Sequence, residues 1–201
     1  MEGLTGLFDA TLLNSTLRFV TPILLAALGG ALCQRVGIFN IALEGMMLTG
    51  AFAAVSGSYW FHSAGLGVLT AVLAGALLAA VFALFTVQLG SDEIVTGIAI
   101  NLLAAGLTVY LLRSLFGVKG AFQDPAIVGL AKIEIPGLKS VPLLGPLFSG
   151  HSWIVYLCLA LVVAIQYFLF RHRLGLRLRG VGENPEAALT LGINVSALQF
   201  G

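Results

Sequence analysis

An apolar run of 18 residues, Trp153–Phe170, leads directly into a stretch with four of the ten lysines and arginines of the chain. A membrane-spanning helix needs about 20 mostly apolar residues, so this run predicts a helix that crosses a bilayer. The four cations are Arg171, Arg173, Arg177 and Arg179. Because short loops rich in Lys and Arg stay in the cytoplasm, these arginines act as topology anchors and place the end of this span inside.

The composition agrees with a membrane protein. Charged residues make up 9 % of the chain, against about 25 % in soluble domains. A soluble surface cannot be built from so few charges, so the composition predicts an integral membrane protein. The net charge of +1 gives no indication of nucleic-acid binding, and the N-terminus has no basic region that would predict a cleavable signal peptide.

Four further apolar runs predict spans at about Thr11–Cys33, Ile41–Tyr59, Leu66–Leu89 and Ile94–Leu112. The expected fold is therefore an all-α polytopic bundle of about five spans, forming a single transmembrane domain over residues 1–201. Counting back from the arginines places the turn Ser56–Gly67 and the loop 113–152 outside, and Gln34–Glu44 inside. The loop is rich in Pro and Gly but has the apolar stretch Val141–Phe148, which favours a short interfacial or re-entrant element over a plain linker.

The segment Gln34–Gly45 holds polar side chains between two apolar runs, together with two glycines that permit a break in the helix. One interpretation is a tight cytoplasmic turn with Arg35 as an anchor. The other is a broken helix within the bundle, since irregular backbone at membrane depth is tolerated where it lines a cavity. Both interpretations stay open. In the second, Asn40 and Glu44 are candidates for the lining of a substrate path.

The start of the fourth span carries further polar groups. Ser91 or Asp92 is expected to cap the helix, and acidic residues in the first turn suit its dipole. Asn101 lies two turns into the span, where a buried amide needs a partner. Two roles stay open for it, a hydrogen bond between helices and a contact with substrate, and it is the third candidate for the substrate path.

Downstream of the arginines, the sequence predicts a short cytoplasmic helix over Pro185–Leu191. Asn184 suits the N-cap, Pro185 the first helical position, Glu186 the positive end of the dipole, and Gly192 the stop. So short a helix is marginal in water. Its apolar side chains, Ala188, Leu189, Leu191 and then Ile193, are expected to find nothing to cover them in their own chain.

The apolar side chains of this helix could pack against either the membrane surface or a partner protein. The arginines upstream would meet anionic lipid, but Glu183 and Glu186 oppose simple adsorption to it. A docking helix for a cytoplasmic partner is therefore the favoured interpretation.

Nothing in the sequence predicts chemistry of its own. No phosphate-binding loop is present, and no His or Cys spacing suggests a metal. Cys33 and Cys158 lie inside apolar runs and predict neither a disulfide nor a ligand pair. His62, His151 and His172 lie at span ends without the company of a catalytic triad. The chain is expected not to be an enzyme and to need no cofactor, so ATP-driven transport would draw its energy from another chain.

Three stretches resemble a known family. Gly180–Ile193, with Gly-Val-Gly-Glu-Asn-Pro-Glu-Ala-Ala, resembles the cytoplasmic coupling segment of ABC importer permeases that handle simple sugars and nucleosides. Arg35–Gly45 and Ser91–Asn101 are similar to stretches of the nucleoside-type branch. The resemblance implies a coupling segment over residues 171–195, whose coupling residues are Gly182, Glu183, Asn184, Pro185, Glu186, Ala187, Ala188 and Gly192.

The resemblance also implies the surroundings of the chain. The expected partners are two cytoplasmic ABC ATPase subunits, a second permease subunit, an external substrate-binding protein and the lipid of a bacterial inner membrane. The expected function is import of nucleosides or simple sugars by a multi-pass permease. Two alternatives are an ATP-independent secondary transporter or channel and a non-transporting membrane scaffold. Family members continue past Gly201 with further spans, which leaves a fragment, a truncated reading frame and a shortened homologue as open explanations.

Overall fold

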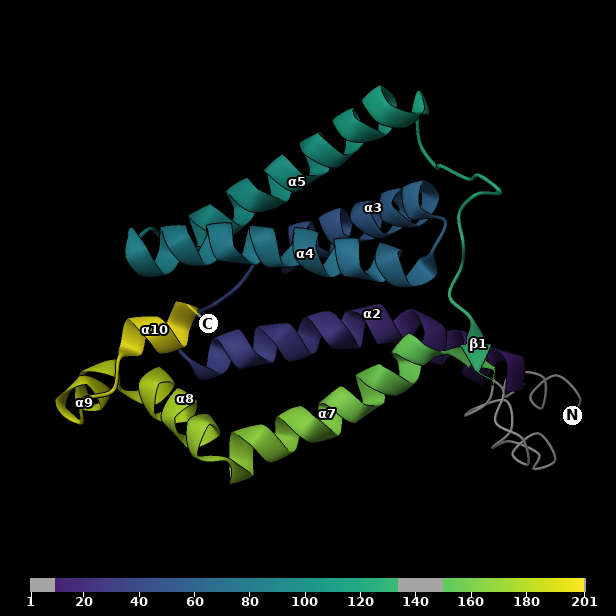
Figure 1. Ribbon diagram of the computed structural model, residues 1–201. Helices are drawn as coiled ribbons and strands as arrows, with labels where there is room; N and C mark the ends of the chain where they lie inside the picture. Colours follow the sequence, from purple (N-terminus) through teal and green to yellow (C-terminus); the bar gives the residue numbers. More distant parts are fainter. Residues whose placement is uncertain (1–9, 134–149, 201) are drawn as a thin grey trace, which may run out of the picture. The chain divides into compact units, whose positions relative to one another are not determined.

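The computed structural model describes residues 10–133 and 150–200, and these are mostly helical (Figure 1). The expected all-α architecture is confirmed. In chain order the elements are α2 Ala10–Arg35, α3 Leu43–Phe61, α4 Ala64–Ala83, the π-helical η2 Leu84–Gln88, α5 Glu93–Phe116, β1 Lys132–Ile133, β2 His151–Ser152, α7 Trp153–Arg171, α8 Arg173–Glu183, α9 Pro185–Thr190 and α10 Val195–Phe200.

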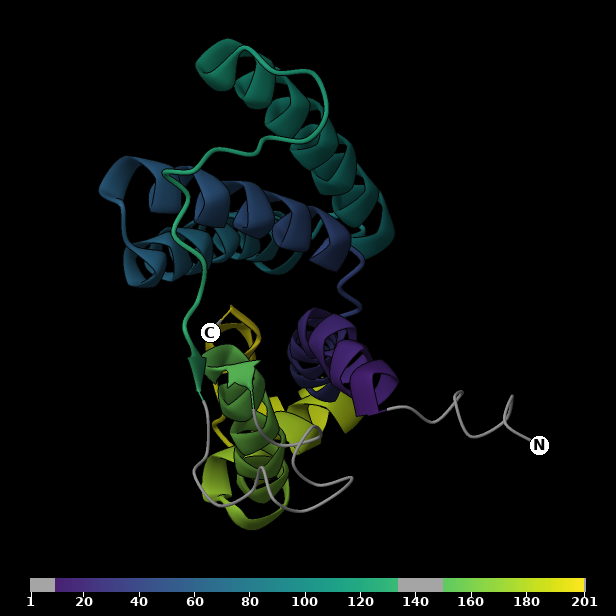
Figure 2. The ribbon, with the colours of Figure 1, turned by 90° about the vertical axis from the view of Figure 1, so that its right-hand side faces the viewer.

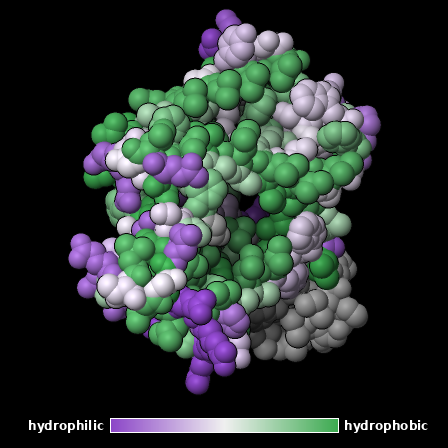
Figure 3. Space-filling view, turned by 60° about the vertical axis from the view of Figure 1, so that its left-hand side comes forward, coloured by the Kyte–Doolittle hydropathy of each residue, from purple (hydrophilic) through white to green (hydrophobic). Residues whose placement is uncertain are grey.

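Four helical stretches of the described chain are long and apolar enough to cross a membrane: Asn14–Arg35, Ala64–Gln88, Glu93–Phe116 and Trp153–Arg171. The fifth expected span forms as α3, at its predicted place and 19 residues long. It is not among the four, because Glu44 and several glycine and hydroxyl residues make it less apolar than the others. Hydrophobic residues nevertheless cover much of the molecular face seen in Figure 3.

The chain divides into two compact units. One comprises Met1–Gly29 and Leu130–Phe170, and the other comprises Gly30–Gly129 and Arg171–Gly201. In the first unit α2 packs along α7, where the Cys158 thiol donates to the Thr21 carbonyl oxygen at 3.8 Å. The antiparallel pair of β1 and β2 lies at the start of α7. The prediction of one transmembrane domain stays a prediction.

In the second unit α3 and α4 lie side by side, joined by a very short connection (Figure 2). The predicted turn lies within Ser56–Gly67 but is much shorter than that segment: α3 continues to Phe61 and α4 begins at Ala64, with only His62 and Ser63 between them. Small residues that suggested a turn instead allow close helix packing. Gly57, for example, lies directly against the Thr70 side chain of α4.

The helix α5 begins where the sequence predicted. Asp92 is its N-cap, and its carboxylate accepts from the backbone N–H groups of Ile94 and Val95, both at 2.9 Å. The helix continues to Phe116, so the loop that was expected from residue 113 begins only at Gly117. The predicted interfacial element at Val141–Phe148 lies outside the described residues.

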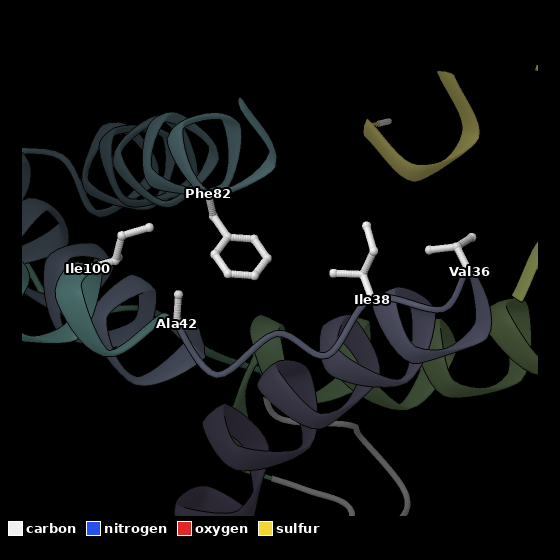
Figure 4. Close-up of a cluster of buried hydrophobic side chains, with 5 residues drawn as sticks. All are labelled: Val36, Ile38, Ala42, Phe82 and Ile100. Carbon is white, nitrogen blue, oxygen red and sulfur yellow. The ribbon is translucent and has the colours of Figure 1, made fainter. Parts of the chain in front are cut away.

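One buried apolar cluster of the second unit lies around the connection between α2 and α3. Its members are Val36, Ile38, Ala42, Phe82 and Ile100. Phe82 projects from α4 towards the connection, on which Ile38 and Ala42 lie (Figure 4). Leu178 of α8 packs against the same cluster. The connection therefore contacts membrane helices and the C-terminal helices alike.

Candidate functional site

The connection, defined here as residues 36–42, is irregular backbone whose polar groups are satisfied by nearby residues. The Phe39 N–H donates to Glu93 Oε2 at 2.6 Å, and the Ala42 N–H donates to Asn40 Oδ1 at 2.9 Å. The carbonyl oxygen of Val36 accepts from Gln199 Nε2 of α10 at 3.1 Å. Buried backbone groups need such partners to avoid a desolvation penalty. The sequence did not predict the role of Glu93 in holding the connection.

Asn101 joins α5 to the start of α3. Its Oδ1 accepts from the Gly45 N–H at 2.7 Å, and its Nδ2 donates to the Ile41 carbonyl oxygen at 3.0 Å. The first N–H groups of a helix lack intrahelical partners, and Ala42 at the N-cap offers no side-chain oxygen. Asn101 therefore supplies the missing cap from another helix. The predicted hydrogen bond between helices is present.

The structure brings the three substrate-path candidates to one region. Asn40 is half-buried in the connection, Glu44 is exposed in the first turn of α3, and Asn101 is half-buried beside Gly45. The helices approach closely here, because a methyl group built at Gly45 would lie 2.8 Å from Asn101 Oδ1. Their contact with substrate stays a prediction.

Replacing Asn101 with leucine is expected to destabilise the chain by about 1–3 kcal/mol, because the Gly45 N–H and Ile41 carbonyl would be left without their partner. The thermal midpoint in mild detergent measures this loss. Leu102→Ala is the matched control, since Leu102 is an exposed neighbour on the same helix. Equal midpoints for Asn101→Leu and the wild type would contradict the capping role.

The basic stretch after α7 is helical, which the sequence analysis missed. Arg171 ends α7, and α8 then runs through Arg173 and Arg177 to Glu183. The closely spaced arginines suggested a cytoplasmic loop. The available signal was Leu178 and Val181, two apolar residues at helical spacing that are less exposed than Arg173 and Arg177.

The predicted end signals of the short helix after the arginines are confirmed. Asn184 is the N-cap of α9, and its Oδ1 accepts from the Ala187 N–H at 3.0 Å. Pro185 holds the first position, and Glu186 lies in the first turn. Gly192 follows the helix with a φ of 75°, a left-handed conformation that favours glycine.

The expectation that this helix has no support in its own chain is wrong. Ala188 is buried against Val181 of α8 and Val195 of α10, with Ile193 and Leu198 packed around them. This support was not predicted from the sequence, because α8 and α10 were not predicted. Two apolar side chains nevertheless remain uncovered in the described structure: Leu189 is 59 % exposed and Leu191 79 % exposed.

A close backbone junction joins α8 to the end of α2. A methyl group built at Gly182 would fall 2.9 Å from the Arg35 carbonyl carbon and 3.1 Å from the Gly37 nitrogen, and closer still to the Arg35 oxygen. These are backbone atoms, so they cannot move aside as a side chain could. Gly37 itself has a φ of 83°. Only glycine fits at Gly182 without displacing α8.

Comparison with known proteins assigns the chain to a family. Residues 12–201 match the family model described as branched-chain amino acid transport system / permease component. The chain is 37 % identical over 193 residues to the guanosine ABC transporter permease protein NupQ of Bacillus subtilis, covering 92 % of this chain and 60 % of that protein. It is 37 % identical over 189 residues to the nucleoside ABC transporter permease protein NupC of Lactococcus lactis, covering 90 % of this chain and 59 % of the relative.

A third relative is the putative glucose ABC transporter permease protein TsgC13 of Haloferax volcanii, 37 % identical over 202 residues, which are 96 % of this chain and 58 % of that protein. The chain thus spans about three fifths of the length of these relatives. No solved structure matches it. The family and the four apolar helices make it a multi-pass protein of the bacterial plasma membrane. The predicted resemblance is confirmed: the chain belongs to the branched-chain amino acid transport system / permease component family.

Proposed function

We propose that this chain is the membrane-spanning subunit of an ATP-driven importer of nucleosides, and that α9 docks on a cytoplasmic ATPase. Permease components of ABC importers work with ATPase and substrate-binding partners. Two of the relatives carry guanosine or nucleoside in their names and one carries glucose, so nucleosides are the favoured substrates and simple sugars the runner-up.

The exposed pair Leu189 and Leu191 carries the docking proposal. The inner face of α9 is already packed on α8 and α10, so the helix has a fixed position. Its outer face presents two large apolar side chains next to a gathering of charge at Glu183 and Glu186. Such a small apolar surface with a charged rim is typical of a protein contact, because charged residues surround and apolar residues fill the centre of interfaces.

Docking of α9 would be transmitted to the membrane helices through the close backbone contact at Gly182. A rigid helix transmits a displacement along its length, and α8 meets the connection at backbone atoms of Arg35 and Gly37. Gln199 of α10 holds the same connection by its hydrogen bond to Val36. The connection in turn carries Asn40 and is bonded to Asn101. Movement of α9 would therefore shift the region of the substrate-path candidates.

Asn40, Glu44 and Asn101 are proposed to line the substrate path. In support, the three polar side chains lie at or beside the irregular connection: Asn40 within it, Glu44 in the first turn of α3 and Asn101 in α5. Polar groups at such positions are rare in membrane proteins and commonly functional. A second permease subunit and an external substrate-binding protein complete the proposal. Only 6 % of the most apolar part of Ala64–Gln88 is buried within the described structure. The rest of this surface is free to contact lipid and a partner subunit.

The proposed function is tested by variants of α9 that should uncouple nucleoside uptake from ATP hydrolysis. Pro185→Gly and Glu186→Lys are expected to lower ATP-driven nucleoside uptake at least about tenfold, since the first loosens the start of α9 and the second opposes its dipole and alters the docking surface. Membrane vesicles with the assembled transporter give the uptake rate, and immunoblots give the amount of inserted chain.

Ser196→Lys is the matched control, because it adds a cation at an exposed position of α10. It should transport as the wild type does. Uptake that persists without ATP, or wild-type uptake in both α9 variants, would reject the coupled importer and favour a secondary transporter.

A further inference from the structure

A pocket of about 340 Å³ lies between α3, α5 and the segment that follows α5. Its walls are mostly apolar, with Phe52 from α3, Phe116 from α5 and Phe122 from the following segment. Two residues with hydroxyl groups, Ser56 and Thr108, are part of the lining. By the predicted topology this end of α3 and α5 is external, the side from which an imported solute arrives.

The Ser56 hydroxyl is unlike the other hydroxyls of these helices. Ser56 is only 3 % exposed, and among the described residues its Oγ has no hydrogen-bond partner. Thr108, across the pocket, donates to the Ala104 carbonyl oxygen at 2.7 Å, which is the usual solution for a hydroxyl in a helix. A buried polar group without a partner is costly. The pocket therefore holds one unsatisfied group suited to a ligand.

The aromatic side chains contribute flat ring surfaces to the pocket wall. The rings of Phe116 and Phe122 lie with centroids 4.2 Å apart at 30°, and Phe52 meets Phe116 edge-on at 6.4 Å. Aromatic side chains stack on nucleobases irrespective of sequence, because every base has a π-face. A sugar, in contrast, has hydroxyl groups around its whole ring and would lose hydrogen bonds to water in such an apolar site.

We propose that this pocket receives the heteroaromatic base of a nucleoside, with the Phe116 and Phe122 rings forming its apolar wall and the Ser56 hydroxyl hydrogen-bonding a polar atom of the base edge. The proposal rests on the proposed import function and names the part of the substrate that this chain recognises. The pocket is partly open, so the ribose would lie towards the mouth, where water satisfies its hydroxyl groups. The nearly apolar lining excludes the reverse orientation.

The experiment measures uptake of radiolabelled guanosine by the assembled transporter in membrane vesicles. Ser56→Ala is expected to raise the concentration for half-maximal uptake about three- to tenfold, the effect of one hydrogen bond. Phe122→Leu is expected to raise it about tenfold by removing a stacking surface. Unlabelled guanosine should compete strongly and unlabelled ribose weakly. Ser114→Ala, at an exposed serine of α5, is the matched control and should change nothing.

A second measurement separates binding from folding. Without nucleoside, Ser56→Ala should keep or raise the thermal midpoint, because it removes an unsatisfied group, while the stabilisation by added guanosine should shrink. Guanosine uptake unchanged in both pocket variants would overturn the base site and leave the import function standing. Competition by ribose equal to that by guanosine would overturn it in favour of a sugar site. Absence of ATP-driven uptake by the wild type would reject the import function and the base site with it.

Discussion

Gly182→Ala is expected to lower ATP-driven uptake at least about tenfold while the chain still inserts into the membrane. The added methyl group would overlap the backbone of Arg35 and Gly37, and overpacking against atoms that cannot move costs typically about 1–3 kcal/mol. The overlap is relieved at the lowest cost in free energy if α8 shifts away from the connection. The C-terminal helices would then move without carrying the connection with them.

Gly180→Ala is the control for this substitution. Gly180 lies in the same helix two residues earlier, and nothing surrounds its methyl position within 4 Å. Alanine in a helix interior is more favourable than glycine by up to about 1 kcal/mol, so Gly180→Ala should be neutral or slightly stabilising. Substrate-stimulated ATPase activity and uptake rate are the paired readouts. Equal uptake by the two variants would show that the Gly182 junction does not transmit the movement.

A double replacement of Leu189 and Leu191 by aspartate is expected to detach the ATPase. Both side chains are largely exposed, so the chain itself should fold normally. Burying each in a partner is worth about 1.5–3 kcal/mol, and an unpaired charge in the contact adds a further penalty. Recovery of the ATPase with the affinity-purified chain should fall at least about a hundredfold in dilute solution.

Ser196→Asp is the control for this pair, because it adds a negative charge at an exposed position in the first turn of α10, outside α9. It should reduce recovery much less than the double replacement. Undiminished recovery with the double variant would place the docking surface elsewhere.

Local signals allowed most of the helices to be predicted from the sequence. The side chains of Asp92 and Asn184 cap helices through hydrogen bonds to backbone N–H groups three residues later. These helix starts can therefore be recognised without any tertiary contact. The long apolar runs likewise define α2, α4, α5 and α7. The turn predicted over Ser56–Gly67 was too long because Gly and Ser occur both in turns and in close helix packing, and Gly57 here packs against Thr70.

The candidate site depended more on contacts between distant residues. The polarity of Asn40 and Asn101 was visible, but Asn101 reaches Gly45 and Ile41 from 56 and 60 positions away in the sequence. The Gly182 junction and the Gln199 hydrogen bond join the two ends of the chain, and no periodicity encodes them. The helix α8 was missed because its arginines dominate its composition, although Leu178 and Val181 carried the helical spacing.

Disulfide cross-linking from position 191 tests directly whether α9 docks on a cytoplasmic ATPase subunit. The chain carries Leu191→Cys in a background with Cys33 and Cys158 replaced by alanine, and single cysteines are placed on the surface of the ATPase subunit. The account predicts a cross-linked permease–ATPase product in the assembled transporter, and protection of Cys at 191 from an impermeant thiol reagent applied outside intact cells. Labelling from outside, or a thiol that stays fully reactive and uncrosslinked in the complex, would contradict it.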